Sequence, residues 1–344
     1  MAASSVTAYN KAFMAFVVML LGSLFISGAQ AVGVCYGRNG AGLPSDAEVV
    51  QLYKANGIGR MRIYDPNPAT LQALRGSNIE LILDIFKNDL QGLANDAAAA
   101  GWVQKNIRAY WPDVKFRYIS VGNEVKPGEP AAQFVLPAMK SIQNAISAAN
   151  LQNQIKVSTA IDTSLLAKSY PPYEGEFSPE AKQHMTPIVQ FLARNGAPLL
   201  ANVYPYFAHV LNKAQVSLEY ALFTSNGVVT PDGTRYQNLF VALMDSVYSA
   251  VDKAGAPGLK IVVSESGWPS AGGDPAATPG NAGTYYKNLI SHVNGGNGTP
   301  KRPQGPIETY LFAMFDENQK PGDEVEKHFG LFSPNKQPKY QLSF

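Results

Sequence analysis

Eight short runs rich in β-branched and other apolar residues recur along the chain, and they limit its possible folds more than any other feature. Most of the runs are continuously apolar and do not alternate with polar residues. Strands of this kind are buried on both faces, as they are in parallel sheets. The runs begin at Val32, Arg60, Ile79, Phe116, Ile155, Pro198, Leu259 and Glu308.

Helical patterns lie between the runs. Ser45 and Glu48 have the spacing of a capping box ahead of the first pattern, and Gly57 and Gly255 stand where helices are expected to end. Residues 169–179 and 271–283, which are rich in glycine and proline, are predicted to form loops. The predicted helices span residues 46–56, 95–111, 137–150, 181–195, 239–255 and 284–293.

Strand and helix signals that alternate in this way predict an α/β fold, a single (β/α)8 TIM barrel over residues 32–344. The composition, 46% hydrophobic and 16% charged, suits a chain with a large buried core. A doubly wound sheet is the alternative fold. Such sheets usually carry a glycine-rich phosphate loop, and no loop of that pattern follows any of the strands, which favours the barrel.

The first 31 residues have the pattern of a secretory signal peptide. Lys11 is the one charged residue before an apolar run over residues 12–26, and Ala29-Gln30-Ala31 fits the small-x-small cleavage site. We expect cleavage after Ala31. No later apolar run is long enough to span a bilayer, so we expect no membrane contact after cleavage.

Several functions are disfavoured by the charge and the side chains available. The formal net charge is +2 and the basic residues are scattered, which gives no support to nucleic-acid binding. The four histidines show no metal-ligand spacing, so we expect no metal and no organic cofactor. The single cysteine, Cys35, lies in the apolar run VGVCYG and is predicted to be buried. We expect a monomer.

Two glutamates follow strands at the end where barrel active sites form. Glu124 follows the fourth predicted strand in VGNEV, and Glu265 ends the seventh in VVSESGWPS. Glycoside hydrolysis uses two such carboxylates, one as acid and one as nucleophile or base. Each has an ordinary structural explanation, because a lone glutamate after a strand is usually a surface charge. A shared predicted rim favours a functional role for both.

The sequence resembles the plant β-1,3-glucanases of glycoside hydrolase family 17. VGNEV and VVSESGWPS carry the resemblance most specifically. It extends through VGVCYGRNGAGLPS, MRIYDPN, QIKVSTAID, GAPLLANVYPYF, ETYLFAMFDENQKPG and VEKHFGLFSPNKQPKY, from about Val32 to Phe344. The resemblance implies a secreted, endo-acting (β/α)8 enzyme that retains anomeric configuration and acts on β-glucan.

The resemblance also implies roles for particular residues. Glu124 would be the acid/base, and Glu265 the nucleophile. Asn123 would hydrogen-bond either the sugar 2-hydroxyl or the nucleophile. The remaining substrate-binding positions would be Tyr64, Tyr204 and Phe207, which line the cleft, and Glu317, Lys320 and Glu326, which form a supporting polar cluster.

Two other activities stay open at this point. A β-1,3-1,4-glucanase of the same family would share both motifs, and a non-catalytic glucan-binding wall protein would keep the cleft without turnover. The chain ends at YQLSF without the extra C-terminal segment of vacuolar family members. On that ground we expect an extracellular location, in the apoplast or cell wall, in preference to the vacuole.

Overall fold

The computed structural model describes residues 32–344, so the predicted signal peptide lies outside the described residues. Eight parallel strands form a closed barrel in the order β1-β12-β11-β8-β5-β4-β3-β2. All eight predicted strands are confirmed. They are β1 (Val32–Tyr36), β2 (Arg60–Ile63), β3 (Glu80–Ile85), β4 (Lys115–Asn123), β5 (Lys156–Asp162), β8 (Leu199–Asn202), β11 (Ile261–Ser266) and β12 (Thr309–Leu311).

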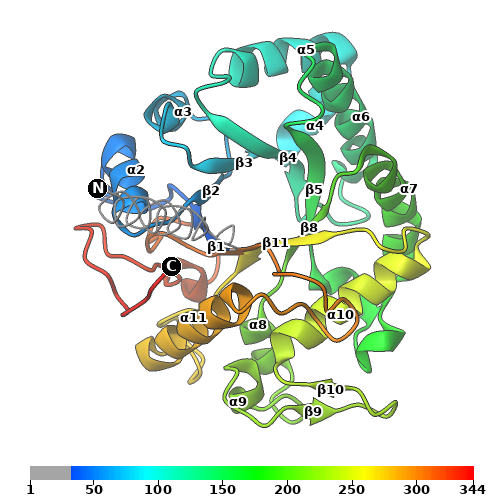
Figure 1. The fold of residues 1–344 in the computed structure, drawn as a ribbon, viewed down its shortest axis with the longest axis vertical. Helices are drawn as coiled ribbons and strands as arrows, with labels where there is room; N and C mark the ends of the chain where they lie inside the picture. Colours follow the sequence, from blue (N-terminus) through cyan, green and yellow to red (C-terminus); the bar gives the residue numbers. More distant parts are fainter. Residues whose placement is uncertain (1–31) are drawn as a thin grey trace, which may run out of the picture.

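Helices surround the barrel, as the view in Figure 1 shows. They are α2 (Asp46–Ala55), α3 (Pro68–Leu74), α4 (Leu90–Leu93), α5 (Asp96–Val103), α6 (Ala132–Ala148), α7 (Pro179–Asn195), α8 (Pro205–Leu211), α9 (Leu218–Ala221), α10 (Leu239–Lys253) and α11 (Pro279–Asn294). Two antiparallel pairs lie in the connections. They are β6 (Leu166–Lys168) with β7 (Glu176–Phe177), and β9 (Val228–Val229) with β10 (Arg235–Tyr236).

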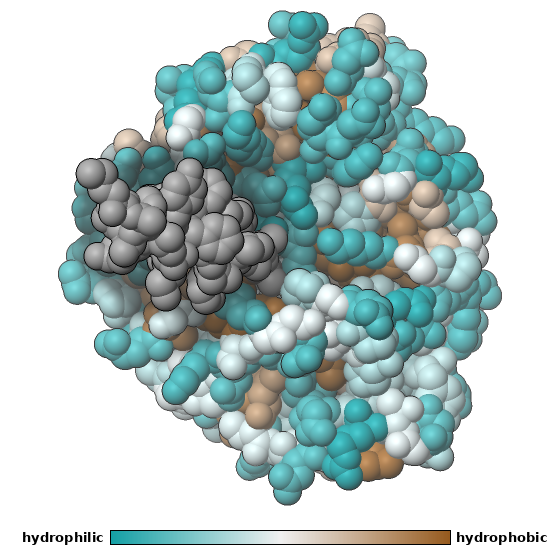
Figure 2. Space-filling view, in the orientation of Figure 1, coloured by the Kyte–Doolittle hydropathy of each residue, from teal (hydrophilic) through white to brown (hydrophobic). Residues whose placement is uncertain are grey.

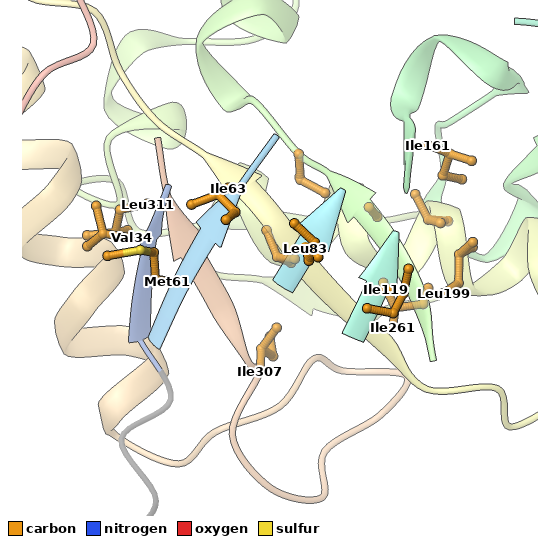
Figure 3. Close-up of a cluster of buried hydrophobic side chains, with 14 of the residues drawn as sticks. Val34, Met61, Ile63, Leu83, Ile119, Ile161, Leu199, Ile261, Ile307 and Leu311 are labelled. Carbon is orange, nitrogen blue, oxygen red and sulfur yellow. The ribbon is translucent and has the colours of Figure 1, made fainter. Parts of the chain in front are cut away.

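Alternation along the strands divides the core into two parts. Side chains such as Met61, Leu83 and Ile119, labelled in Figure 3, belong to the larger cluster. This cluster also contains apolar residues of the helices. Their neighbours Ile82 and Leu200 belong to a smaller cluster inside the barrel. Because side chains alternate with a period of two, a polar residue next to an outward-facing position points into the barrel. This register decides which charges reach the active-site end.

Helix ends follow the capping signals more closely than the predicted bounds. The capping box of Ser45 and Glu48 is formed, and Gly57 and Gly255 have φ values of +69° and +90°. The predicted start of α6 at Pro137 is wrong, because the helix begins at Ala132 and includes this proline. Proline removes only one internal hydrogen bond, and the buried face of the helix continues on both sides of it.

Three further predictions of boundaries are corrected. The helix expected over 284–293 begins at Pro279, where Thr278 caps it, which shortens the predicted loop 271–283. The expected helix 95–111 is α5 followed by a π-helical turn over Gln104–Arg108. The predicted loop 169–179 contains the short strand β7.

The outer surface seen in Figure 2 is mostly hydrophilic, with apolar residues in separate patches. Cys35 is buried inside the barrel, as predicted. None of the helices within residues 32–344 combines the length and the apolar composition that crossing a membrane requires.

Candidate active site

A cavity of about 890 Å³ opens at the carboxyl ends of the strands and collects residues from distant parts of the sequence. All nine predicted site residues line it. They are Tyr64, Asn123, Glu124, Tyr204, Phe207, Glu265, Glu317, Lys320 and Glu326. This volume lies within the usual range for small-molecule sites. The fold therefore brings these nine side chains together at one rim.

Three hydrogen-bond donors converge on the Glu265 carboxylate. Its Oε1 accepts from Nη1 of Arg62 at 2.9 Å and from the Tyr64 hydroxyl at 2.8 Å. Its Oε2 accepts from the Tyr204 hydroxyl at 2.7 Å. One donor is cationic and all three lie on barrel strands or directly after them, so the carboxylate is held in a fixed orientation.

Arg62 is the centre of the network below the cavity and is 0% exposed. Nε and Nη2 bind the Asp84 carboxylate at 3.1 and 2.6 Å. Nη2 also donates to Asn123 Oδ1 at 2.9 Å, and Nη1 donates to Asn202 Oδ1 at 3.1 Å. A buried guanidinium is tolerated when its N–H groups are paired in this way. Arg62 thus connects residues of β2, β3, β4, β8 and β11.

Glu124 has a different environment. Its carboxylate accepts one side-chain hydrogen bond, from Asn202 Nδ2 at 2.8 Å. Burial raises the pKa of Glu124 to about 7, and the negative charge of Glu265 acts in the same direction. A carboxyl group with this pKa keeps its proton in mildly acidic solution. Glu265 accepts from three donors and Glu124 from one, so the two glutamates have different environments although they share one cavity.

Backbone irregularities aim both glutamates into the cavity. The β4–β5 register shifts between Ser120 and Asn123, and the β11–β8 register shifts between Val263 and Glu265. Bulges of this kind redirect side chains at the end of a strand. Glu124 has a φ of +52°, which costs a residue with a side chain about 1–2 kcal/mol. Its amide donates to Ala160 O at 2.9 Å, which holds this conformation.

Asn123 and Asn202 connect the two carboxylates. Asn202 Nδ2 donates both to Glu124 Oε1 at 2.8 Å and to Asn123 Oδ1 at 3.0 Å. The Ser264 hydroxyl donates to Asn202 Oδ1 at 2.7 Å and fixes the orientation of this amide. One of the two contacts expected of Asn123 was a hydrogen bond to the nucleophile. In the structure, Asn123 is linked to Glu265 through Arg62, which donates from Nη2 to Asn123 and from Nη1 to Glu265.

Aromatic rings form one wall of the cavity. Tyr204 makes edge contacts with Phe207, Phe312 and Phe329 at centroid distances of 5.5, 6.3 and 5.9 Å. Tyr64 contacts Phe312 at 6.4 Å. Such contacts hold the two tyrosine hydroxyls in place, and rings of this kind also offer apolar faces to a sugar.

The polar segment after β12 also lines the cavity. Lys320 pairs with Glu326 at 2.9 Å, and its ammonium lies 4.7 Å from the centre of the Phe312 ring. Glu317 is buried, accepts from the Asn39 amide at 3.0 Å, and has a raised pKa because of this burial. A side chain at Gly37 would collide with the Glu317 carboxylate, so glycine is needed there.

Sequence reasoning missed five site residues: Arg62, Asp84, Asn202, Phe312 and Phe329. A signal for the charged pair was present, because MRIY and LILDI each place one charge of opposite sign inside an apolar strand. A buried charge needs a partner, and neighbouring strands could supply it. Phe312 and Phe329 carry no such signal, since phenylalanines are ordinary core residues.

The fold and this rim together define a class of protein. A parallel barrel with two glutamates in unlike hydrogen-bonding environments, set in a cavity with aromatic walls, has the equipment of a glycoside hydrolase. Within the described part of the chain, no three His, Cys, Asp or Glu side chains are arranged to hold a metal ion.

Comparison with known proteins identifies the family. The profile of glycosyl hydrolases family 17 matches residues 32–344. The chain belongs to this family of glycosyl hydrolases. It is 62% identical to a glucan endo-1,3-beta-glucosidase of Vitis vinifera, in a match that covers 97% of this chain and 98% of the relative.

Two further similarities bear on structure and location. A solved structure described as one of two plant beta-glucan endohydrolases with distinct substrate specificities is 49% identical, with a TM-score of 0.86. That match covers 91% of this chain and 100% of the other. A basic vacuolar glucan endo-1,3-beta-glucosidase of Nicotiana plumbaginifolia is 53% identical, over 95% of this chain and 90% of the relative.

Proposed function

We propose that this protein hydrolyses internal β-1,3-glucosidic bonds of β-glucans with retention, using Glu265 as nucleophile and Glu124 as acid/base. The observation that carries this proposal is the unequal treatment of the two glutamates. Glu265 receives three donors, one of them Arg62, whereas Glu124 receives one amide donor and has a pKa near 7. An anion beside a protonated acid is the pairing that double displacement needs.

In the first step, Glu265 attacks the anomeric carbon while Glu124 gives its proton to the departing glycosidic oxygen. The C–O bond to the leaving chain breaks as the glycosyl–enzyme ester forms. In the second step, Glu124, now ionised, takes a proton from water, whose oxygen attacks the same carbon and releases Glu265. The network around Arg62 keeps the Glu265 carboxylate in place throughout, which lowers the cost of ordering the reactants.

The substrate is proposed to lie across the rim, with Tyr64, Tyr204 and Phe207 against its sugar faces and Asn123 near the reacting sugar. Glu317, Lys320 and Glu326 would support the opposite side of the cleft. Laminarin, fungal wall glucan and callose are the polymers that the proposal includes. These substrates would give the protein a part in defence or in cell-wall remodelling.

Mixed-linkage β-1,3-1,4-glucan is the second candidate substrate. It is favoured by the similarity to a structure described as a plant beta-glucan endohydrolase from a pair with distinct substrate specificities. Both substrates would use the same two glutamates. A glucan-binding protein without turnover remains the least favoured proposal, because binding alone does not need a proton on one carboxylate and a charge on the other.

We also propose that residues 1–31 are removed on secretion and that the mature protein acts as a monomer outside the cell. The apolar run at 12–26 and the Ala29-Gln30-Ala31 site support secretion. The similarity to a vacuolar isoform makes the vacuole the alternative destination. Fusion of residues 1–31 to a reporter and localisation of the product would distinguish the two.

The test of function is reducing-sugar release from laminarin and from mixed-linkage β-glucan, with Glu265→Gln as the control. We expect release from laminarin that disappears in the variant. Release mainly from the mixed-linkage polymer would retain the mechanism and change the substrate. No release from either polymer by folded protein would contradict the proposed activity and leave glucan binding as the function to measure.

A further inference from the structure

Asp84 is a buried charge that the proposed mechanism does not use. It lies on β3, points into the barrel and is 2% exposed. Both of its oxygens accept from Arg62, in a bidentate pair with the Nε and Nη2 edge. A buried ion pair is weak evidence for stability, because two hydrophobic residues of similar volume often serve as well. Arg62 also donates to Glu265, and this contact suggests another reason for the Arg62–Asp84 pair.

We propose that Asp84 is a positioning residue, which turns the Arg62 guanidinium so that Glu265 receives a single N–H and keeps one carboxylate oxygen available for attack. This inference rests on the proposed function, because it concerns Glu265 as the nucleophile. Arginine and carboxylate groups readily form bidentate pairs. Asp84 occupies the edge of Arg62 that would otherwise offer Glu265 such a pair.

The contacts of the two Glu265 oxygens agree with this arrangement. Oε1 accepts from both Arg62 and Tyr64, so its two lone pairs are used. Among the described residues, Oε2 accepts only from the Tyr204 hydroxyl, at 2.7 Å. A carboxylate oxygen has a second lone pair, and on Oε2 this pair is available to the anomeric carbon. A bidentate Arg62–Glu265 pair would occupy it.

Charge acts in the same direction as geometry. Asp84 offsets the positive charge of Arg62, so Glu265 is oriented by the guanidinium without being fully neutralised by it. Full neutralisation would stabilise the free carboxylate and weaken its attack. The charged and titratable groups that face this pair or Glu265 are Cys35 on β1, Arg62 on β2, Tyr64 directly after β2, Glu124 after β4, Tyr204 after β8, and Glu317 and Lys320 after β12.

The test is Asp84→Asn, measured on the polymer that the wild-type protein hydrolyses. We expect kcat to fall about 10- to 100-fold while KM stays within about twofold, because the defect concerns attack and not binding. Burial raises the pKa of Asp84 to about 6, so the ionisation of Asp84 contributes to the acidic limb of kcat/KM; Asp84→Asn removes this contribution and should move the limb to lower pH. The alkaline limb should not move.

Asp162→Asn is the matched control, since it removes a surface-side carboxylate that acts on Glu124 and is not among the groups that act on Asp84. It should move the alkaline limb and leave the acidic limb in place. If Asp84→Asn protein has wild-type kcat and an unmoved acidic limb, Asp84 is a structural residue and the proposal is overturned. A lower melting temperature of the variant would not change this conclusion.

Asp84→Glu covers the case in which Asp84→Asn does not fold. It keeps the anion and the ion pair but displaces the guanidinium by about one methylene group. We expect a loss of kcat with the acidic limb near its wild-type position, and wild-type kcat would contradict the proposal. Wild-type protein that releases no sugar would contradict the proposed function itself, whereas active wild type with unaffected Asp84 variants would contradict only this inference.

Discussion

The two ends of the barrel both bury clusters of arginine and carboxylate, but they balance charge in opposite ways. At the amino ends of the strands, Arg117 binds Glu308 through two hydrogen bonds of 2.8 Å and Glu80 at 3.0 Å. Arg60 pairs with Glu80 at 2.8 Å, and Lys260 lies 3.6 Å from Glu308. Three cationic side chains there face two carboxylates.

At the carboxyl ends, Arg62 binds two carboxylates, those of Asp84 and Glu265, and the charge of Glu265 acts in turn on Glu124. The effect on pKa differs accordingly. Burial alone would raise the pKa of Glu308, but Arg117 and the neighbouring cations lower it. Burial raises the pKa of Glu124 to about 7, and Glu265 adds to the rise. The ion pairs at the amino ends therefore stabilise the fold. At the carboxyl ends, the burial that raises the pKa of Glu124 lowers stability wherever this carboxyl group is ionised.

The largest expected effect concerns the charge of Glu265. Glu265→Gln should lower kcat at least about 10³-fold on every substrate, because an amide cannot attack the anomeric carbon. Glu124→Gln should lose about 10²–10⁴-fold on polymers but far less on aryl glycosides with good leaving groups, which need no protonation. Equal losses on both kinds of substrate for the two variants would remove the distinction between the carboxylates.

The second prediction concerns the amino end. Glu308→Gln should lower the free energy of unfolding by about 3–5 kcal/mol, because Arg117 loses its main buried partner. Turnover of the remaining folded protein should be unchanged. Denaturant unfolding at neutral pH and steady-state kinetics measure the two effects. Glu80→Gln is the matched control at the same cluster, and its more exposed carboxylate should make the loss smaller.

The third prediction is that a substitution at the carboxyl ends of the strands, Glu124→Gln, raises stability where Glu308→Gln lowers it. The folded-state pKa of Glu124, about 7, lies above its ordinary value of 4.5. The native state therefore binds more protons between these values, and the contribution of Glu124 to stability is lost as the pH rises through about 7. Glu124→Gln should be more stable than wild type at pH 8, by about 1–3 kcal/mol, and nearly equal to it at pH 4.

Thermal unfolding of both proteins across this pH range is the measurement. If Glu124→Gln is less stable than wild type at pH 8, the ionised Glu124 stabilises the fold as Glu308 does, and the proposed difference between the two ends of the barrel is wrong. A parallel series on Glu308→Gln provides the reference. Its carboxylate has a lowered pKa, so its stabilising contribution is present at neutral pH and is lost as the pH falls through the folded-state pKa.

The smallest expected effect is a shift of the alkaline limb of activity. Wild-type activity should decline as the pH rises through about 7, when Glu124 loses its proton. Asp162 raises and Lys126 lowers the pKa of Glu124, and these two side chains form an ion pair with each other. Asp162→Asn should move the limb down and Lys126→Met should move it up, each by a few tenths of a unit. Shifts in the same direction in pH–rate profiles would contradict this assignment.

The sequence by itself determined the barrel and the positions of its chemistry along the chain. Continuous apolar strands such as IELILDI can be buried only between two layers, and alternation with helices then leaves few folds. Active sites of (β/α)8 barrels form at the carboxyl ends of the strands, and this rule predicted that Glu124 and Glu265 lie at one rim although 140 residues separate them. Their catalytic roles stay predictions that the variants above test.

Only the tertiary structure decided what surrounds these two residues. Whether a strand residue faces the helices or the barrel interior depends on register, and the bulges before Asn123 and Glu265 shift that register locally. Arg62 and Asp84 therefore became site residues through packing between strands, which no local pattern specifies. The raised pKa of Glu124 has the same origin, because burial and neighbouring charges set a pKa and both are properties of the folded chain.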